Sequence, residues 1–246
     1  MVRRVSIVIP VLNDAQALTR CLAALKDEMP STYEIIVCDG GGDAACAEIA
    51  RKSGARYCAS APGRAVQMNA GAELASGEWL WFLHADCVPA RGSIDALTRV
   101  DPRRAWGCFR HRIDAPGVLL RVIESADNFR ARLMRLPYGD QGLFVRRDVF
   151  RELGGFANVP VLEDVVLARM LAEFGAPRVL HPLLRTDARR WLRHGVMKTT
   201  WMNWRVMWMY LVTRRDIGDI AAYYRGGRSP GSAPNERSTS SVSDAT

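Results

Sequence analysis

The segment GEWLWFLHAD, residues 77–86, decides the fold class of this chain. It contains an unbroken run of large apolar residues from Trp79 to Leu83, and a run this short predicts a strand buried inside a sheet. The run stops at His84 and Asp86. A carboxylate at the end of a core strand is costly to remove from water, so we expect Asp86 to meet a backbone amide, an arginine or a metal ion.

Short β-rich segments alternate with helical segments before this strand. Strands are predicted at RRVSIVIPVLN (3–13), YEIIVCDG (33–40) and ARYCAS (55–60). A helix follows each of them, at residues 14–29, 43–54 and 65–76. The first helix has one apolar face, made of Ala17, Leu18, Cys21, Leu22 and Leu25. Strands that alternate with helices of this length indicate an α/β fold with a mostly parallel sheet.

The pattern changes beyond this first part of the chain. RAWGCFRHRI (104–113) alternates with period two, as an antiparallel or half-exposed strand does. Later segments predict a helix at 117–136, a turn, strand and short helix within 138–156, and a helix at 161–175. We expect one domain over residues 1–225, made of two halves at 1–100 and 101–225. Residues 226–246 are rich in Gly, Ser and Pro, and we expect them to be disordered.

The positive charge of the chain is concentrated in one segment. The whole sequence has a net charge of +8, and residues 178–228 hold eleven Lys and Arg against three Asp and Glu. Basic segments attract anions such as phosphates, nucleic acid or acidic lipid headgroups. No apolar run reaches the roughly 20 residues that span a bilayer.

The six cysteines show no metal or disulfide pattern. None form a C-x-x-C pair, none lie near a histidine at zinc spacing, and most sit in apolar runs where a thiol behaves as a small hydrophobe. This usage is typical of a reducing compartment. We therefore expect a cytoplasmic protein, with peripheral contact at the inner membrane face left open by the basic segment.

Polar residues follow three of the predicted strands where each one ends. The first strand ends with Pro10 and Asn13, the second with Asp39, and the fourth with His84 and Asp86. Ligands of open α/β sheets bind beyond the carboxyl ends of the strands. We expect these side chains to gather along one rim of the sheet.

Four segments together resemble family 2 glycosyltransferases of the GT-A fold. They are SIVIPVLND (6–14), EIIVCDGG (34–41), GRAVQMNAGAELASGEWLWFLHAD (63–86) and GGFANVPVLEDVVLARML (154–171). The match runs from Val5 to about Tyr224. The set GRAxQMNAGA, FLHAD, YGDQGLFVRR, ED and ARRW is closest to a bacterial subfamily of selenodomain-associated or arsenosugar-biosynthesis type transferases.

The resemblance implies a fold and an activity. The fold would be a Rossmann-like, mostly parallel sheet flanked by helices, with further helices at the C-terminal end. The activity would be an inverting transfer of a hexose-type sugar from a nucleoside diphosphate donor, a UDP-sugar, to an acceptor hydroxyl. The partners would be that donor and a small or lipid-linked acceptor, with no nucleic acid.

Two acids carry the implied chemistry. Asp86 corresponds to the last acid of the D-x-D metal element, with His84 where the first acid often stands. A divalent ion, Mg²⁺ or Mn²⁺, would neutralise the diphosphate leaving group, and such ions often take only one or two protein ligands. Asp164 corresponds to the catalytic base that takes the acceptor proton. Alternative interpretations are a cap or ion-pair partner for Asp86, and capping of a helix by Glu163 and Asp164.

The resemblance implies further site residues. Donor nucleotide contacts are assigned to Pro10, Asn13, Asp39, Arg64 and Asn69. Contacts with the acceptor and the diphosphate are assigned to Asp140, Gln141, Glu163, Arg190 and Trp191. Several of these have structural alternatives: an Asx turn for Asp39, a surface position for Arg64, a bond to its own helix turn for Asn69, a plain turn for Asp140, and a solvated basic face for the segment with Arg190 and Trp191. The resemblance makes residues 1–100 the nucleotide-binding half and residues 101–225 the acceptor half.

The segment WMNWRVMWMYLVTRR (201–215) mixes tryptophans with arginines. Such a helix suits the membrane interface, and it predicts peripheral membrane contact through residues 191–215. Core packing and a dimer contact are the alternatives.

Two other functions compete with glycosyl transfer. A nucleotidyltransferase of similar fold would need a Gly-rich basic loop after the first strand, and PVLNDAQ (10–16) is neither Gly-rich nor basic. A non-catalytic protein that binds anions or membranes would need only the basic segment.

Overall fold

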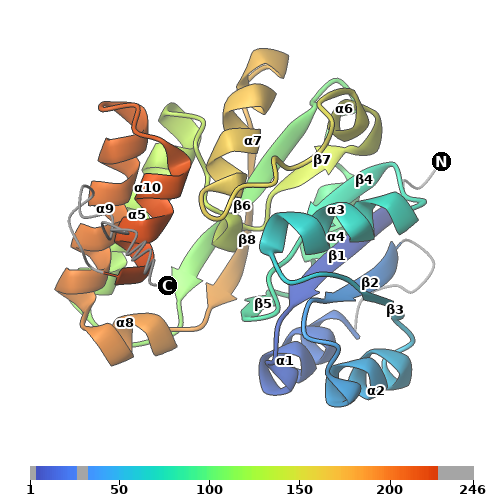
Figure 1. The fold of residues 1–246 in the computed structure, drawn as a ribbon. Coiled ribbons are helices and arrows are strands. Elements are labelled where there is room, and N and C mark those ends of the chain that lie inside the picture. The colour runs from blue at the N-terminus through green and yellow to red at the C-terminus, as the bar shows by residue number, and fades with distance from the viewer. Residues whose placement is uncertain (1–3, 27–32, 227–246) are drawn as a thin grey trace, which may run out of the picture.

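The structure, a computed structural model, describes residues 4–26 and 33–226. Within them, one sheet has its strands in the order β3-β2-β1-β4-β7-β6-β8-β5 (Figure 1). The strands are β1 (Val5–Val11), β2 (Tyr33–Asp39), β3 (Arg56–Ala59), β4 (Trp79–Phe82), β5 (Cys87–Pro89), β6 (Trp106–Ile113), β7 (Phe144–Arg146) and β8 (Arg178–Thr186). The helices are α1 (Ala15–Leu25), α2 (Ala44–Lys52), α3 (Arg64–Leu74), α4 (Ser93–Thr98), α5 (Val118–Leu133), α6 (Arg147–Glu152), α7 (Glu163–Leu171), α8 (Arg189–His194), α9 (Val196–Leu211) and α10 (Ile217–Gly226), with 3-10 turns η2 (Gly139–Gln141) and η3 (Ala172–Phe174).

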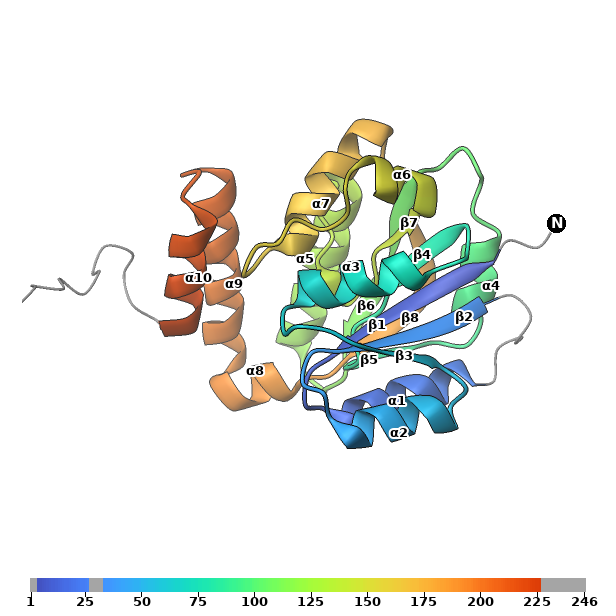
Figure 2. The ribbon, with the colours of Figure 1, turned by 45° about the vertical axis from the view of Figure 1, so that its right-hand side comes forward.

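The first half of the sheet is parallel, as predicted. β1 pairs with β2 and β4, and β2 pairs with β3, all in parallel. Every residue of β1 and β4 is buried, because α1 and α2 cover one face of the sheet and α3 covers the other (Figure 2). The predicted apolar face of α1 is the face that is buried. The predicted α/β fold is confirmed.

The second half of the sheet mixes directions. β7 lies antiparallel to both β4 and β6, whereas β8 runs parallel to β6 and antiparallel to β5. The predicted alternation holds only in the second half of β6: residues 106–109 are all buried, whereas Arg110 and Arg112 are exposed and His111 and Ile113 are buried. His111 of β6 therefore faces the interior of the protein.

β5, β8 and α4 were not predicted from the sequence, and no range was predicted for α8 or α10. β5 has only three residues, and α4 has six. The sequence of β8, RVLHPLLRT, contains Pro182, and its pairing with β6 shifts register opposite Phe109 and Arg110. Neither a continuous apolar run nor a regular alternation survives such an irregularity, so no local pattern marks the strand.

The C-terminal helices α8, α9 and α10 stand together beside the sheet (Figure 2). α10 extends to Gly226, so this residue is helical and not part of the expected disordered tail. Residues 227–246, to which the rest of that prediction applies, lie outside the described residues. The six cysteines are free, and no helix in the described ranges is long and apolar enough to cross a membrane.

Candidate active site

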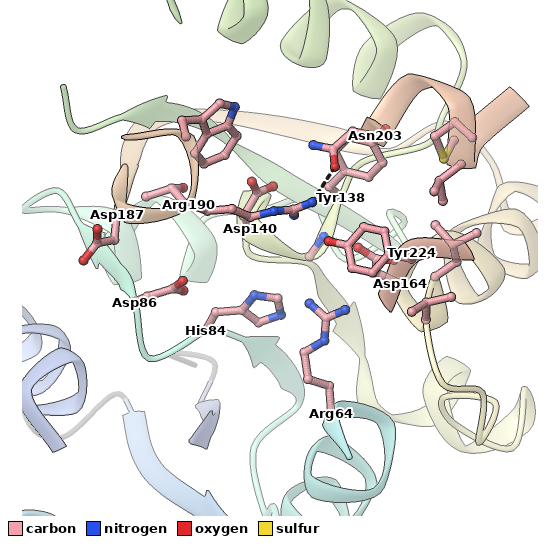
Figure 3. A pocket seen from close by; sticks show the side chains of 17 residues that line it. Arg64, His84, Asp86, Tyr138, Asp140, Asp164, Asp187, Arg190, Asn203 and Tyr224 are labelled. Atoms are coloured by element: carbon pink, nitrogen blue, oxygen red, sulfur yellow. Dashed lines mark hydrogen bonds between the residues drawn. The ribbon is translucent and has the colours of Figure 1, made fainter. Parts of the chain in front are cut away.

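A pocket of about 190 Å³ lies at the carboxyl ends of β4 and β8 (Figure 3). Its polar lining consists of Arg64, His84, Asp86, Tyr138, Asp140, Asp164, Thr186, Asp187, Arg190, Asn203 and Tyr224. β7 runs antiparallel to β4, so the η2 turn before β7 reaches the same edge of the sheet as the end of β4. Strand ends, one turn, the ends of α3, α7, α8 and α10, and the middle of α9 therefore line one cavity.

Asp86 presents its carboxylate to this pocket. Within the described residues it has no ion pair, and its only side-chain neighbour at hydrogen-bonding distance is the thiol of Cys87, at 3.8 Å. Burial raises the pKa of Asp86, and the charge of Asp187 raises it further, while Arg189 and Arg64 oppose the shift. Figure 3 shows the carboxylate turned toward the space between His84 and Arg190. A hydrogen bond from its own backbone N–H also lowers the pKa of Asp86. Of the three expected partners, an amide is therefore present, no arginine forms an ion pair with Asp86 in the described residues, and the carboxylate still lines the pocket.

Asp187 is a second acid at this edge, and the sequence did not single it out. Its backbone N–H donates to the carbonyl of Asp86 over 3.1 Å. Its own carboxylate pairs with Arg20 at 2.9 Å and with Arg189 at 2.8 Å. The two arginines neutralise Asp187, so Asp86 remains the acid available to a ligand.

His84 is a neutral imidazole. Burial lowers its pKa to about 4, Arg64 lowers it as well, and Asp164 partly opposes them. At neutral pH the ring can donate or accept one hydrogen bond but carries no charge. A side-chain Cβ on Gly139 would come within 2.7 Å of this ring, so glycine is needed for the η2 turn to approach His84.

Asp164 is held by two backbone amides. The N–H of Val165 donates to one oxygen over 2.8 Å, and the N–H of Gly139 donates to the other. The residue before the ED pair, Leu162, adopts the left-handed conformation, with φ of 63°. That conformation is rare for a branched side chain, and here it starts α7 with Asp164 facing the pocket. Asp164 therefore ties α7 to η2 and lines the cavity as well.

Glu163 does not line the pocket. Its side chain is 2% exposed and pairs with Arg64, with 2.8 Å between Oε1 and Nε. Burial and the neighbouring Asp164 raise the pKa of Glu163, while Arg64 lowers it. The effect of the pair is to fix the half-exposed guanidinium of Arg64 at the pocket wall, so Glu163 acts on the site through Arg64.

A buried charge cluster lies behind Asp140. His111 stands between two acids, with 3.7 Å from Nδ1 to Asp140 and 3.4 Å from Nε2 to Asp127. Burial lowers the pKa of His111, but the two carboxylates outweigh it and raise the pKa above its ordinary value. Burial raises the pKa of Asp140, and His111 opposes that shift. The only sequence signal for His111 was its inward position in the alternating strand.

The opposite wall is made by the C-terminal helices. Arg190 donates to Asn203 over 2.9 Å and lies 5.0 Å from the centre of the Tyr224 ring. Trp191 is buried beside it and lines the pocket. Asn203 and Tyr224 were not expected from the sequence, because nothing local marks a residue that reaches the pocket only through packing of α9 and α10.

The structure thus brings together part of the predicted site. The pocket gathers Arg64, Asp86, Asp140, Asp164, Arg190 and Trp191. It does not include Pro10, Asn13, Asp39, Asn69, Gln141 or Glu163. Pro10 pairs with Cys38, one position before the end of the β1–β2 pairing, and Asn13 lies in the loop after β1, beside Gly41.

Three of these outlying side chains are occupied by other partners. Asp39 accepts from the amides of Gly41 and Asp43, as the Asx-turn interpretation expected, and also from Tyr57. Asn69 exchanges two hydrogen bonds with the backbone of Phe156, and Gln141 bonds Tyr138 and Asn128. The side-chain amides of Asn69 and Gln141 thus hold loops around the pocket in place.

Comparison with known proteins gives one family. Residues 6–152 match the family model described as glycosyl transferase family 2. Glycosyltransferase AglE of Haloferax volcanii is 29% identical over 171 residues, which cover 63% of this chain and 56% of that protein. The PGL/p-HBAD biosynthesis glycosyltransferase of Mycobacterium tuberculosis is 28% identical over 167 residues, covering 61% of this chain and 62% of that protein. The chain thus spans less than two thirds of the length of these relatives.

Solved structures show the same fold. The mannosyltransferase PcManGT from Pyrobaculum calidifontis, in complex with GDP-Man and Mn²⁺, superposes with a TM-score of 0.64 at 17% identity, covering 91% of this chain and 70% of that one. Glucosyl-3-phosphoglycerate synthase from Mycobacterium tuberculosis, in complex with Mn²⁺, UDP and glucosyl-3-phosphoglycerate, gives a TM-score of 0.58 at 18% identity, covering 82% and 79%. Both are GT-A enzymes in their architecture, with a mixed sheet flanked by helices as in this chain.

Proposed function

The chain belongs to glycosyl transferase family 2, and on this premise we propose that it moves a sugar from a nucleoside diphosphate donor to an acceptor hydroxyl with inversion at the anomeric carbon. One observation carries the proposal. The pocket combines an acid without an ion-pair partner in the described residues, Asp86, with a second acid, Asp164, that backbone amides hold in place. The first suits a cation that accompanies a diphosphate, and the second suits a general base.

The donor set at Asp86 fits a hard divalent ion. No three His, Cys, Asp or Glu side chains come together as metal ligands in the part of the chain that the structure describes. Mg²⁺ and Mn²⁺ do not need such a cage, since they keep several waters and take the remaining ligands from substrate phosphates. The two solved structures above contain Mn²⁺. We assign Asp86 as the protein ligand, and the bound ion would neutralise charge on the diphosphate leaving group.

The other residues of the pocket position the substrate. Arg64, fixed by Glu163, and Arg190, fixed by Asn203, carry guanidinium groups that suit phosphate oxygens. A cavity of about 190 Å³ is smaller than the ~300–1,000 Å³ of typical ligand pockets, so it would enclose the sugar and diphosphate rather than a whole nucleotide sugar. Asp164 takes the proton of the acceptor hydroxyl as that oxygen attacks the anomeric carbon, and the diphosphate leaves from the opposite face.

Finer assignments also belong to this proposal. We take a UDP-sugar as the donor and a hexose as the transferred group. GDP-Man in one structural neighbour and UDP in another show that related folds hold either base. Residues 1–225 would act as one domain, since strands from both predicted halves are interleaved in a single sheet. The motif set quoted above supports the bacterial selenodomain-associated subfamily.

Calorimetry tests the proposal without knowledge of the acceptor. UDP and GDP are titrated into the protein with Mn²⁺, with Mg²⁺ and with EDTA. Metal-dependent binding is expected for the wild type and should be lost in Asp86→Asn. Asp114→Asn, an exposed acid after β6, serves as the matched control and should bind as the wild type does. Failure of both UDP and GDP to bind with either metal would refute the proposed donor, and undiminished metal-dependent binding by Asp86→Asn would refute its assignment as the metal ligand.

A further inference from the structure

The outer face of α9 is an exposed apolar stripe. Its members are Met197, Trp201, Trp204, Trp208 and Val212, each between 56% and 70% exposed. They are spaced by four, three, four and four residues, which places them on one side of a helix. Leu192 on α8 is exposed as well. We call these six residues the tryptophan stripe.

The tryptophan stripe is not the packing face of the helix. The opposite side of α9 carries Val206, Met207 and Met209, which are buried in the core, and Asn203, which lines the pocket. Single exposed apolar residues are normal on a protein surface, but a contiguous aromatic face marks a contact site. Of the alternatives drawn from the sequence, core packing is therefore wrong for the three tryptophans, although it is right for the inner side of the same helix.

The chain around the stripe has no negative charge. Residues 188–215 contain seven Arg and Lys and not one Asp or Glu. Arg205 lies 5.0 Å from the centre of the Trp201 ring, and Arg193, Lys198, Arg214 and Arg215 are exposed. Tryptophans that alternate with cations match the interface of an anionic bilayer, where indole rings settle at headgroup level and cations meet lipid phosphates.

Charge and composition argue against the other occupants. A second copy of this chain would bring the same exposed cations, Arg193, Lys198, Arg205, Arg214 and Arg215, toward one another, with no acid in residues 188–215 to pair with them. The chain's own residues 227–246 contain no aromatic residue and no Leu, Ile or Met, so they have nothing with which to cover an aromatic face. An anionic lipid surface supplies both the apolar phase and the phosphates.

We propose that the tryptophan stripe and its flanking cations dock this protein on the surface of an anionic lipid bilayer. The helix lies in the plane of the headgroups and does not cross them. Docking is a property of α8 and α9 and does not depend on the proposed glycosyl transfer. Docking through the outer face of α9 leaves the inner face of the same helix in the pocket wall.

Vesicle flotation tests the proposal on the full chain. Vesicles of phosphatidylcholine alone and of phosphatidylcholine with phosphatidylglycerol are mixed with the protein at low and high salt. Binding is expected to the anionic vesicles only, with loss at high salt. The variant Trp201→Ala/Trp204→Ala/Trp208→Ala should lose flotation, whereas Leu74→Ala/Phe174→Ala, which removes exposed apolar groups elsewhere, should float as the wild type does.

Tryptophan emission gives an independent measurement. The chain has seven tryptophans, and Trp79, Trp81, Trp106 and Trp191 are buried. A blue shift on adding vesicles therefore reports on α9. Circular dichroism melting confirms that the variants are folded. The proposal is overturned by absence of anionic-vesicle binding at low salt, by equal binding to neutral vesicles, or by a dimer in light scattering that the triple variant abolishes.

Discussion

Replacing Asp164 by asparagine separates the structural role of this residue from its chemical role. In the wild type both carboxylate oxygens accept backbone N–H groups, one from Val165 and one from Gly139. An asparagine amide can accept only one of these hydrogen bonds with its oxygen, and it turns an NH₂ group toward the other donor. Asparagine is therefore not an equivalent replacement at this position, although the two residues are nearly equal as helix caps.

The two consequences have different sizes. Gly139 is buried, and a buried N–H left without an acceptor costs about 1–3 kcal/mol of unfolding free energy. A domain with about 5–15 kcal/mol of stability remains mostly folded after such a loss. Removal of a general base lowers the rate by about 10²–10⁴-fold, which is about 3–5.5 kcal/mol in the activation barrier. If turnover falls by more than the loss of folded protein can explain, Asp164 is identified as the base.

The assay combines three measurements on one preparation. Thermal melting gives the stability change, calorimetry with UDP and Mn²⁺ gives donor affinity, and release of UDP from the donor gives turnover, with water as the acceptor. We expect reduced stability, affinity within a few-fold of the wild type, and turnover reduced by about 10²-fold or more. Asp216→Asn, which alters a carboxylate that accepts the Gly218 amide outside the pocket, controls for loss of an acid–amide contact. Near wild-type turnover by Asp164→Asn would refute its role as the base.

Three further predictions follow from the same site. Asp86→Asn should abolish the Mn²⁺ dependence of nucleotide binding with little change in melting temperature, and retained dependence in calorimetry would count against the assignment. Gly139→Ala should lower both stability and turnover, since its Cβ would lie 2.7 Å from the His84 ring, and wild-type values for both would contradict the close packing. The raised pKa of His111 should stabilise the fold fully below the ordinary value of 6.5 and lose that contribution as pH rises through the raised pKa. Melting temperatures of the wild type and His111→Gln from pH 6 to 9 should then converge, and a constant difference would refute the protonated cluster with Asp140.

Local patterns predicted the first half of the fold well. The apolar runs of β1 and β4 and the stripe on α1 each depend on a few neighbouring residues, so periodicity alone reveals them. β8 could not be predicted in this way, because Pro182 and the register shift break its pattern and only its pairing with β6 and β5 makes it a strand. The strand therefore forms because of tertiary contacts and not because of its local sequence.

The site residues also divide into those that a local feature predicts and those that only tertiary packing places. Asp86 was predictable because a strand end is a local feature with a fixed place in the sheet. Asn203 and Tyr224 reach the pocket only through the packing of α9 and α10, which no local spacing records. Asn69 shows another case: the resemblance assigned it to the donor nucleotide, and no local pattern indicated that both ends of its amide bond the backbone of Phe156.

The pocket is completed by residues far apart in the order of synthesis. Its earliest charged residue is Arg64 and its latest polar residue is Tyr224, while the last strand of the sheet already ends at Thr186. On the ribosome the sheet can therefore assemble before the wall formed by α9 and α10 exists. A nascent chain at that stage would hold Arg64, Asp86 and Asp164 without Arg190, Asn203 and Tyr224 on the opposite wall. The pocket could then bind its substrate only once α10 has emerged, after the sheet has already formed.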